Sequence, residues 1–474
     1  MTEENVLARR YATPDMTDIF SERGKILSER ELWIAVMKAQ HDAGVDISSE
    51  TIAKYEAAKE NIDVERIEQR ERETRHDVKA RIEAFVEAAQ APEAIHRGLT
   101  SRDLTENVEQ MQSRKAANVI HGKYVSVLRH LLDRATQYSD VPLTARTHHQ
   151  AAQLTTLGRR LSMYAEELHW HIEDFGRYID EFPLRGIKGP VGTQYDMLAL
   201  LGTQGKVDTL EQTIASMLGF QKTLTAPGQV YYRSLDEALL SRLACLTAPC
   251  ANFAKGMRLM AGYDLVTEGF KKGQVGSSAM PHKMNTRTSE RVCGLANIIK
   301  GHQDMASRIS GDTWEEGDVS CSAPRRVYLA DAFYASDGLC ESALTILNEM
   351  GPYPGVLAAE ANKYLPFLVS TDILGTLTKA GIGREAAHAL VKKHSVGEAL
   401  RMREGYSPLV LEKIADDPVC KDLGITLDSL RERSIDLLRL TGNARSQVDA
   451  VRTKAMPLLE KYAAQAAYEP RDIL

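Results

Sequence analysis

The amino-acid sequence predicts a mainly α-helical protein built around a central bundle of long helices. The clearest sign lies between residues 157 and 182, where apolar residues recur every three or four positions with charged residues between them. This spacing places the apolar side chains on one face of a single long helix, close to a heptad repeat. Strand signals are scarce, because no segment alternates β-branched residues with polar ones and the chain contains only 16 prolines.

Further helices are predicted along the middle of the chain. They are indicated by one apolar face between Tyr124 and Ala135 and by helical runs at 234–264, 285–309 and 326–350. The heptad-like spacing at 157–182 indicates core packing, and also association between subunits through the long helices.

Two breaks divide the predicted helices. One lies near Pro92, and the other at 351–354, where two prolines among turn-forming residues should end any helix. We therefore expect three all-α domains, with a central bundle that is flanked by a helical domain on each side. Their predicted bounds are 1–100, 101–352 and 353–474.

The overall charge and hydropathy exclude several classes of protein. The chain carries 59 basic and 65 acidic side chains, a net charge of −6, so binding of nucleic acid through bulk charge is not expected. An anionic ligand would need a local cluster of cations. The opening MTEENVLARRYATPD has no apolar signal-peptide core, and no run of about 18 apolar residues occurs, so no membrane contact and a cytoplasmic location are expected.

The six cysteines give no sign of a disulfide framework or a metal site. They form no CxxC pair, and no spacing of cysteine and histidine is typical of zinc ligands. Buried free thiols are the simpler interpretation.

Reactive side chains gather in four short segments that are far apart in the sequence. The first is 73–77. In the second, 98–103, Thr100 and Asp103 resemble a helix-capping pattern. The free N–H groups of a helix start can hold a carboxylate or phosphate oxygen, although a plain helix cap is equally consistent with this segment.

The third segment contains two adjacent histidines, His148 and His149, followed by the run 153–156 at the expected start of the long helix. Neighbouring side chains project in different directions, so the two histidines are not a natural metal pair. One of them could serve as an acid or base while the other packs or faces water, and a plain surface or core histidine is the alternative.

The fourth segment, GSSAMPHKMN at 276–285, interrupts the helical pattern. Gly276 and the two serines allow a mobile loop with exposed N–H groups, and Lys283 supplies a cation near Ser277. Taken alone, such a loop is consistent with a flexible connector.

In combination, these segments resemble a known enzyme family. Gly-Ser-Ser-x-Met-Pro-x-Lys-x-Asn at 276–285 resembles the signature of the fumarase/aspartase superfamily of lyases, and 98–103 and 147–150 are similar to two further motifs of it. The resemblance extends from about residue 9 to the last helices and is closest to the adenylosuccinate lyase family. The residues that carry this closer match are Arg10-Tyr11-Ala12, Arg75-His76-Asp77, Gln153-Leu154-Thr155-Thr156, Gly228-Gln229, Met280-Pro281-His282-Lys283 and Leu365-Pro366-Phe367.

The resemblance implies β-elimination of fumarate from adenylosuccinate, giving AMP, and from the ribonucleotide SAICAR, giving AICAR. Such a reaction needs a base, an acid for the leaving nitrogen and stabilisation of negative charge. The resemblance implies Ser277 as the base, activated by Lys283, and His148 as the acid, oriented by Glu290. His76 is the rival for the role of acid. No metal and no other cofactor is implied.

The implied substrate carries two carboxylates and a phosphate, so a chain of net charge −6 must gather cations locally. The resemblance assigns substrate binding to Arg10, Tyr11, Arg75, Asp77, Thr100, Ser101, Thr147, Gln229, Asn285, Arg291, Ser322 and Arg326.

The resemblance also implies a homotetramer whose active sites are shared between three subunits. Segments 75–77 or 100–101, 147–149 and 277–291 would then come from different chains, and the loop at Ser277 would close over the substrate as a lid.

Four positions depart from the usual pattern of the family. Met284 and Thr286 replace an arginine and a proline, and Thr286 is expected to cap the helix that follows. His149 stands where glycine or an aromatic residue is common. Gly317 replaces an arginine, so Arg325 or Arg326 is expected to supply the missing cation.

Three alternatives remain beside this interpretation. The first is another lyase of the superfamily, such as argininosuccinate lyase, fumarase or carboxymuconate cycloisomerase, although Arg10-Tyr11 and 153–156 favour the purine enzyme. The second is a non-catalytic structural relative, against which the joint presence of Ser277, His148 and Lys283 argues. The third is a helical scaffold that binds partner proteins. Such a scaffold would not need the glycine and serine loop at 276–285.

Overall fold

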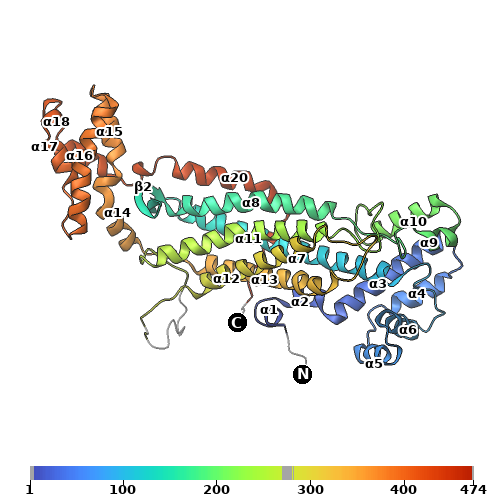
Figure 1. Cartoon of the computed structure of the whole chain (residues 1–474). Helices are drawn as coiled ribbons and strands as arrows, with labels where there is room; N and C mark the ends of the chain where they lie inside the picture. The colour runs from blue at the N-terminus through green and yellow to red at the C-terminus, as the bar shows by residue number, and fades with distance from the viewer. Residues whose placement is uncertain (1–4, 270–279, 281, 472–474) are drawn as a thin grey trace.

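The computed structural model describes residues 5–269, 280 and 282–471, and its centre is a bundle of long helices (Figure 1). The apolar faces of these helices share one buried core, so the predicted all-α fold is confirmed. Four of the predicted helical runs match one of them to within a few residues, whereas the run from Tyr124 to Ala135 covers only the last part of a much longer helix. The bundle consists of α7 (Ser101–Gln137), α8 (Leu157–Glu181), α11 (Ser234–Ala261), α12 (Arg287–Ile309) and α13 (Ser322–Glu349).

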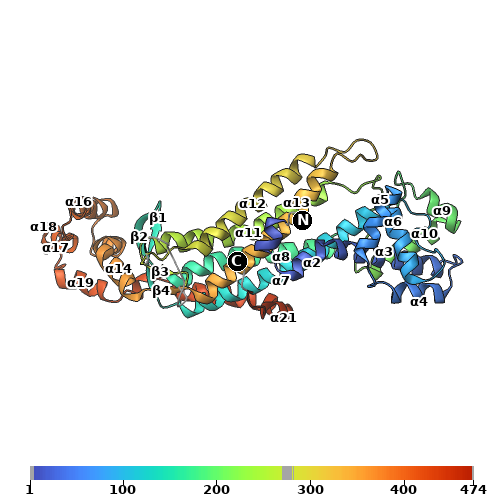
Figure 2. The same ribbon diagram turned by 90° about the horizontal axis from the view of Figure 1, so that it is seen from below.

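Smaller helices cover the two ends of the bundle (Figures 1 and 2). At one end lie α3 (Glu22–Asp42), α4 (Ser49–Ala57), α5 (Val64–Thr74), α6 (Asp77–Ala89), α9 (Tyr195–Leu201) and α10 (Gln204–Met217). At the other end lie α14 (Pro354–Leu368), α15 (Ser370–Lys379), α16 (Arg384–Arg403), α17 (Val410–Asp416), α18 (Pro418–Asp422) and α19 (Leu427–Ile435). Each end has an apolar core of its own. The domain bounds themselves stay predictions.

The remaining helices run along the bundle. Near the N-terminus these are α1 (Val6–Arg10) and α2 (Pro14–Phe20); after the short 3-10 turn η1 (Arg439–Thr441), the chain returns in α20 (Ala444–Lys461) and α21 (Ala463–Ala466). Helix α20 lies beside α8 in Figure 1. None of the helices in the described part of the chain is long and apolar enough to cross a lipid bilayer.

Two small antiparallel sheets interrupt the helices. Strand β1 (Pro142–Thr147) pairs with β2 (Gln150–Thr156), and β3 (Val266–Thr267) pairs with β4 (Gly351–Pro352). The prediction that 153–156 starts the long helix was therefore wrong, since α8 begins only at Leu157. The cause is non-local, because these residues pair with 142–145 and Leu154 packs into a small apolar cluster with α14.

The expectation of buried thiols was correct for most of the cysteines. All six are free; Cys245 is exposed and Cys293 is half-buried, and the rest are buried.

A buried cluster of charges joins α7 to α13. The ammonium group of Lys123 forms ion pairs with Asp337 and Glu341, which are fully buried. Burial alone would lower the pKa of Lys123, but the two carboxylates reverse this effect and raise it. The lysine therefore stays charged inside the bundle.

The same carboxylates hold both ends of the chain. Asp337 accepts hydrogen bonds from the backbone N–H of Thr13 at 2.6 Å and from its hydroxyl at 2.8 Å. Glu341 accepts hydrogen bonds from the hydroxyl of Tyr468 at 2.6 Å and from the N–H of Arg471 at 2.7 Å. The cluster thus fixes the segment that follows Arg10-Tyr11 and the C-terminal tail onto the bundle.

We predict that Lys123→Met lowers the free energy of unfolding by about 3–5 kcal/mol, because two carboxylates are then left buried without their cation. Urea unfolding measures the change. Lys54→Met is the control, since Lys54 forms an exposed pair with Glu50 on α4 and should cost less than about 1 kcal/mol. Equal losses for the two variants would contradict the role of the buried cluster.

Candidate active site

His148 and His149 form the tip of the β1–β2 hairpin. Thr147 pairs with Gln150, which leaves the two histidines as a two-residue turn. Their φ angles are 49° and 61°, in the left-handed region that costs about 1–2 kcal/mol for a residue with a side chain. Hairpin turns of this kind prefer Asn-Gly, so this tip is strained and presents both imidazoles to the surface.

Contacts beneath the tip hold it in place. The hydroxyl of Tyr263 hydrogen bonds with Nε2 of His149 at 3.1 Å. Arg146 forms an ion pair with Glu360 of α14, and its guanidinium lies 4.7 Å from the ring centre of Tyr263 and 5.6 Å from that of Tyr364. The predicted acid, His148, therefore stands on an anchored turn. Sequence reasoning missed these supports, although Arg146 lies within the segment that it singled out.

The strain gives a prediction at position 149. Glycine there should be more stable than alanine by about 1 kcal/mol, because both lose the imidazole but only alanine keeps the cost of a positive φ. Urea unfolding of His149→Gly and His149→Ala measures the difference.

The matched control is His171 in the middle of α8, where the order should reverse, since glycine is the weaker helix former by about 1 kcal/mol. The same order of stability at both positions would show that the turn is not strained.

The start of α7 lies at the opposite end of the bundle and is organised by Asp103. This buried carboxylate accepts the N–H of Thr100 at 2.8 Å, so the predicted capping pattern is confirmed. It also accepts a hydrogen bond from Arg185 at 2.6 Å and from the N–H groups of Lys188 at 2.8 Å and Gly189 at 3.0 Å. Asp103 therefore ties the 185–189 loop to the residues that open the helix.

Arg185 connects the start of α7 to the segment that contains Gln229, which in turn contacts the loop before Ser322. Its guanidinium donates to the carbonyl of Gly228 at 2.9 Å, and the N–H of Gln229 donates to the carbonyl of Glu316 at 2.7 Å. Gln229 therefore lies between the start of α7 and the loop that leads to Ser322, the first residue of α13.

The turn between α5 and α6 contains Arg75, His76 and Asp77. Arg75 ends α5 with a φ of 53°, and His76 caps α6 by accepting the N–H of Lys79 at Nδ1, at 3.3 Å. Burial lowers the pKa of His96, and the nearby His76 adds a smaller lowering. The carboxylate of Asp103, at the start of α7, acts against this lowering and raises the pKa of His96.

Helix α7 separates these residues from the hairpin. It has 37 residues and is therefore about 55 Å long at 1.5 Å per residue. Figures 1 and 2 both show the β1–β2 hairpin at one end of the bundle and α5 and α6 at the other. Within one chain, His76 and His148 cannot act on the same small molecule.

A third group of predicted residues surrounds the start of α12. Ser277 lies outside the described residues. Thr286 occupies the N-cap position, but its side chain makes no capping bond, so the expectation for it was wrong. The carboxylate of Glu268 caps the helix instead, because it accepts the N–H groups of Thr288 and Ser289, each at 2.9 Å. No local pattern predicts this cap from a residue about twenty positions earlier.

The N-terminal segment joins this third group. The guanidinium of Arg291, on α12, lies 5.9 Å from the ring centre of Tyr11, and Arg10 beside it is exposed. Glu290 is also exposed, on the first turn of α12. Both it and His148 are described, and the two form no hydrogen bond with each other within this chain.

Gly317 is required by the backbone. Its φ is 146°, a conformation that residues with side chains rarely adopt, and an added Cβ would lie 3.2 Å from a methyl group of Val230. An arginine is therefore disfavoured at 317 by the path of the chain.

Arg325 does not replace the missing cation, so that part of the expectation was wrong. Its side chain is 3% exposed and forms ion pairs with Asp236 at 2.8 Å and Glu109 at 2.5 Å. These carboxylates raise its pKa, although burial alone would lower it. Arg326 is exposed on the first turn of α13 and remains the candidate.

A sequence model of a lyase family matches residues 9–301, more than half of the chain. The chain belongs to this lyase family. It is 33% identical over 450 residues to the adenylosuccinate lyase of Saccharomyces cerevisiae. This alignment covers 94% of the chain and 92% of the yeast protein. It is 32% identical over 451 residues to the adenylosuccinate lyase of Schizosaccharomyces pombe, with the same shares of the two chains covered.

Solved structures of two other enzymes share the fold. The 3-carboxy-cis,cis-muconate lactonizing enzyme of Pseudomonas putida matches with a TM-score of 0.80 at 20% identity, over 97% of this chain and all of that one. A fumarate lyase of Mesorhizobium matches with a TM-score of 0.79 at 19% identity, over 94% of this chain and 98% of that one.

No group of three or more His, Cys, Asp or Glu side chains in the described residues is placed to hold a metal ion.

Proposed function

We propose that this chain cleaves adenylosuccinate to AMP and fumarate, and SAICAR to AICAR and fumarate. The adenylosuccinate lyases of the two yeasts, which align with it over nearly its whole length, support this substrate class. The observation that carries the proposal is the presence of three exposed groups with the chemistry that β-elimination needs: the His148 hairpin, the His76 turn and the 282–291 segment. The cytoplasmic location stays a prediction.

Assembly of a homotetramer would bring the three groups together. Because α7, about 55 Å long, lies between the His76 turn and the His148 hairpin, a complete site needs more than one chain. Large apolar side chains are exposed on four of the long helices, and they provide a surface for subunit contacts. They include Met163 and Trp170 on α8, Leu259 on α11, Ile298 on α12 and Val327 on α13.

In the proposed reaction, Ser277 removes a proton from the carbon next to a carboxylate of the succinyl group. Lys283 lowers the cost of the negative charge on the serine oxygen. The electron pair left on this carbon forms the double bond of fumarate as the bond between the adjacent carbon and the nitrogen breaks, and His148 gives its proton to the leaving nitrogen. Glu290 of another subunit orients His148, and His76 positions the substrate.

The remaining predicted residues bind the substrate anion. Arg326 supplies the cation that is missing at Gly317, where the backbone disfavours an arginine, and Arg291 with Tyr11 supplies another contact. The full proposed set is Arg10, Tyr11, Arg75, Asp77, Thr100, Ser101, Thr147, Gln229, Asn285, Arg291, Ser322 and Arg326.

Purified protein should consume adenylosuccinate, with loss of the ultraviolet absorbance of the purine and release of fumarate. Ser277→Ala should abolish turnover and leave the assembly intact, because only the base is removed. Turnover of argininosuccinate or malate in place of adenylosuccinate would overturn the proposed substrate class. A fully active Ser277→Ala variant would leave the substrate class standing and exclude the serine as base.

Shared sites predict complementation between two inactive variants. We expect His148→Gln to lose activity by about 100-fold or more, because a group that handles a proton is removed. His76→Gln should lose activity by a similar factor of about 100, because the substrate is no longer held in position. When the two are dissociated, mixed and reassembled, activity should return in part, because some sites then receive both intact histidines from different chains.

The control for complementation is the double variant, His76→Gln with His148→Gln, reassembled with itself, which should stay inactive. Native mass spectrometry confirms that mixed assemblies have formed. Mixed assemblies without any recovered activity would contradict the sharing of sites between subunits.

A further inference from the structure

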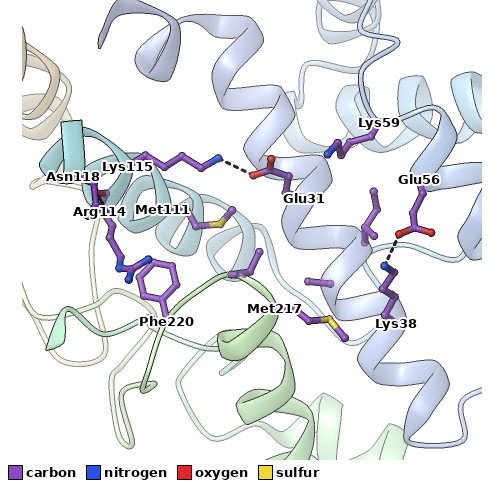
Figure 3. Close-up of a pocket in the computed structure, with 13 residues that line it drawn as sticks. Glu31, Lys38, Glu56, Lys59, Met111, Arg114, Lys115, Asn118, Met217 and Phe220 are labelled. Carbon is purple, nitrogen blue, oxygen red and sulfur yellow. Dashed lines mark hydrogen bonds and ion pairs between the residues drawn. The ribbon is translucent and has the colours of Figure 1, made fainter. Parts of the chain in front are cut away.

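A second cavity, separate from the proposed site, lies where α3, α4 and α7 meet the end of α10 (Figure 3). Its volume is about 490 Å³, within the range of pockets that hold small organic molecules. None of the proposed catalytic or substrate-binding residues lines it. The nearest lining residue of α7 is Met111, ten positions or about 15 Å along the helix from Ser101.

The wall of this cavity is apolar and suits a flat ring. Met111 of α7, Met217 at the end of α10 and the ring of Phe220 line it (Figure 3). Ile34 of α3 adds a branched apolar chain. Thioether sulfur makes favourable contacts with aromatic rings, and unbranched methionine chains adapt to their shape. An aromatic ligand is therefore favoured over a purely polar one.

The edge of the cavity carries an excess of positive charge. Lys38, Lys59, Arg114 and Lys115 face only two carboxylates, those of Glu31 and Glu56, in a chain whose net charge is −6. Two of the cations are neutralised nearby, because Lys38 pairs with Glu56, and Lys115 with Glu31 at 2.8 Å. The local charge is the opposite of that of the whole protein.

Lys59 and Arg114 have no carboxylate partner within ion-pair distance in the described part of the chain. The guanidinium of Arg114 lies 4.9 Å from the ring centre of Phe220, and only its Nε donates a hydrogen bond, to the carbonyl of Ile179 at 3.4 Å. Burial lowers the pKa of Arg114 because its charge is partly desolvated. An anion in the cavity would compensate this charge.

We propose that this cavity binds a compact organic anion with an aromatic ring, an aryl phosphate or aryl carboxylate. The ring rests between Met111, Met217 and Phe220, and Arg114 and Lys59 hold the anionic group. Because the cavity shares no residue with the proposed active site, such a ligand occupies it together with adenylosuccinate.

The test measures binding of 1-naphthyl phosphate to the whole protein by isothermal titration calorimetry, with AMP in excess to fill the proposed active site. We expect saturable binding that Lys59→Met and Arg114→Met each weaken by about tenfold or more, as the loss of a charge-assisted contact implies. Lys54→Met, on the exposed surface of α4, is the matched control and should bind as the unchanged protein does.

Two further probes separate the two parts of the proposed ligand. Inorganic phosphate lacks the ring and 1-naphthol lacks the charge, so each should bind at least about tenfold more weakly than 1-naphthyl phosphate. Equal binding of either probe would overturn the proposed chemistry.

Absence of binding, or binding that neither cavity variant weakens, would overturn the site itself. Lys59 lies just beyond the end of α4, so its replacement leaves the helix packing in place should Arg114→Met fail to fold.

Discussion

The uninterrupted length of α7 is the constraint on which the rest of the structure depends. Its first turn is fixed by Asp103, its middle carries Lys123, and its end leads directly into the His148 hairpin. Most of its faces are buried, so the helix is held by neighbours on several sides. A rigid element of about 55 Å cannot fold its ends together, so the reactive residues at those ends must face outward.

Buried charges decide where the loops lie. Asp103 accepts hydrogen bonds from N–H groups of the 185–189 loop, and Asp337 accepts one from the N–H of Thr13. Glu360 forms an ion pair with Arg146. Burying such groups costs solvation, so they add little net stability compared with an apolar core. Their contribution is positional, since each carboxylate is satisfied only when a segment from a distant part of the sequence is in place.

The sequence predicted what depends on local pattern. Apolar periodicity located the long helices, and Thr100 with Asp103 marked the start of one of them. Strand pairing at 153–156 was missed, because it depends on a partner segment and on α14. The Glu268 cap and the burial of Arg325 were missed for the same reason, since both are set by residues far away in the chain. Motif resemblance located the reactive segments and implied that they act from different chains, but only the structure shows that α7 lies between the His76 turn and the His148 hairpin.

The separation has a consequence for how activity is maintained. If sites are shared as proposed, an isolated chain holds every reactive residue but no complete site. The free energy of association between subunits therefore also brings the catalytic groups together. Mass action then links activity to protein concentration. The strained hairpin fits this scheme, because a tip held by Arg146 and Tyr263 presents His148 in a fixed direction before any partner arrives. Because the tip is already formed, less conformational entropy is lost when the subunits associate. The strain of its positive φ angles arises during folding and not during assembly.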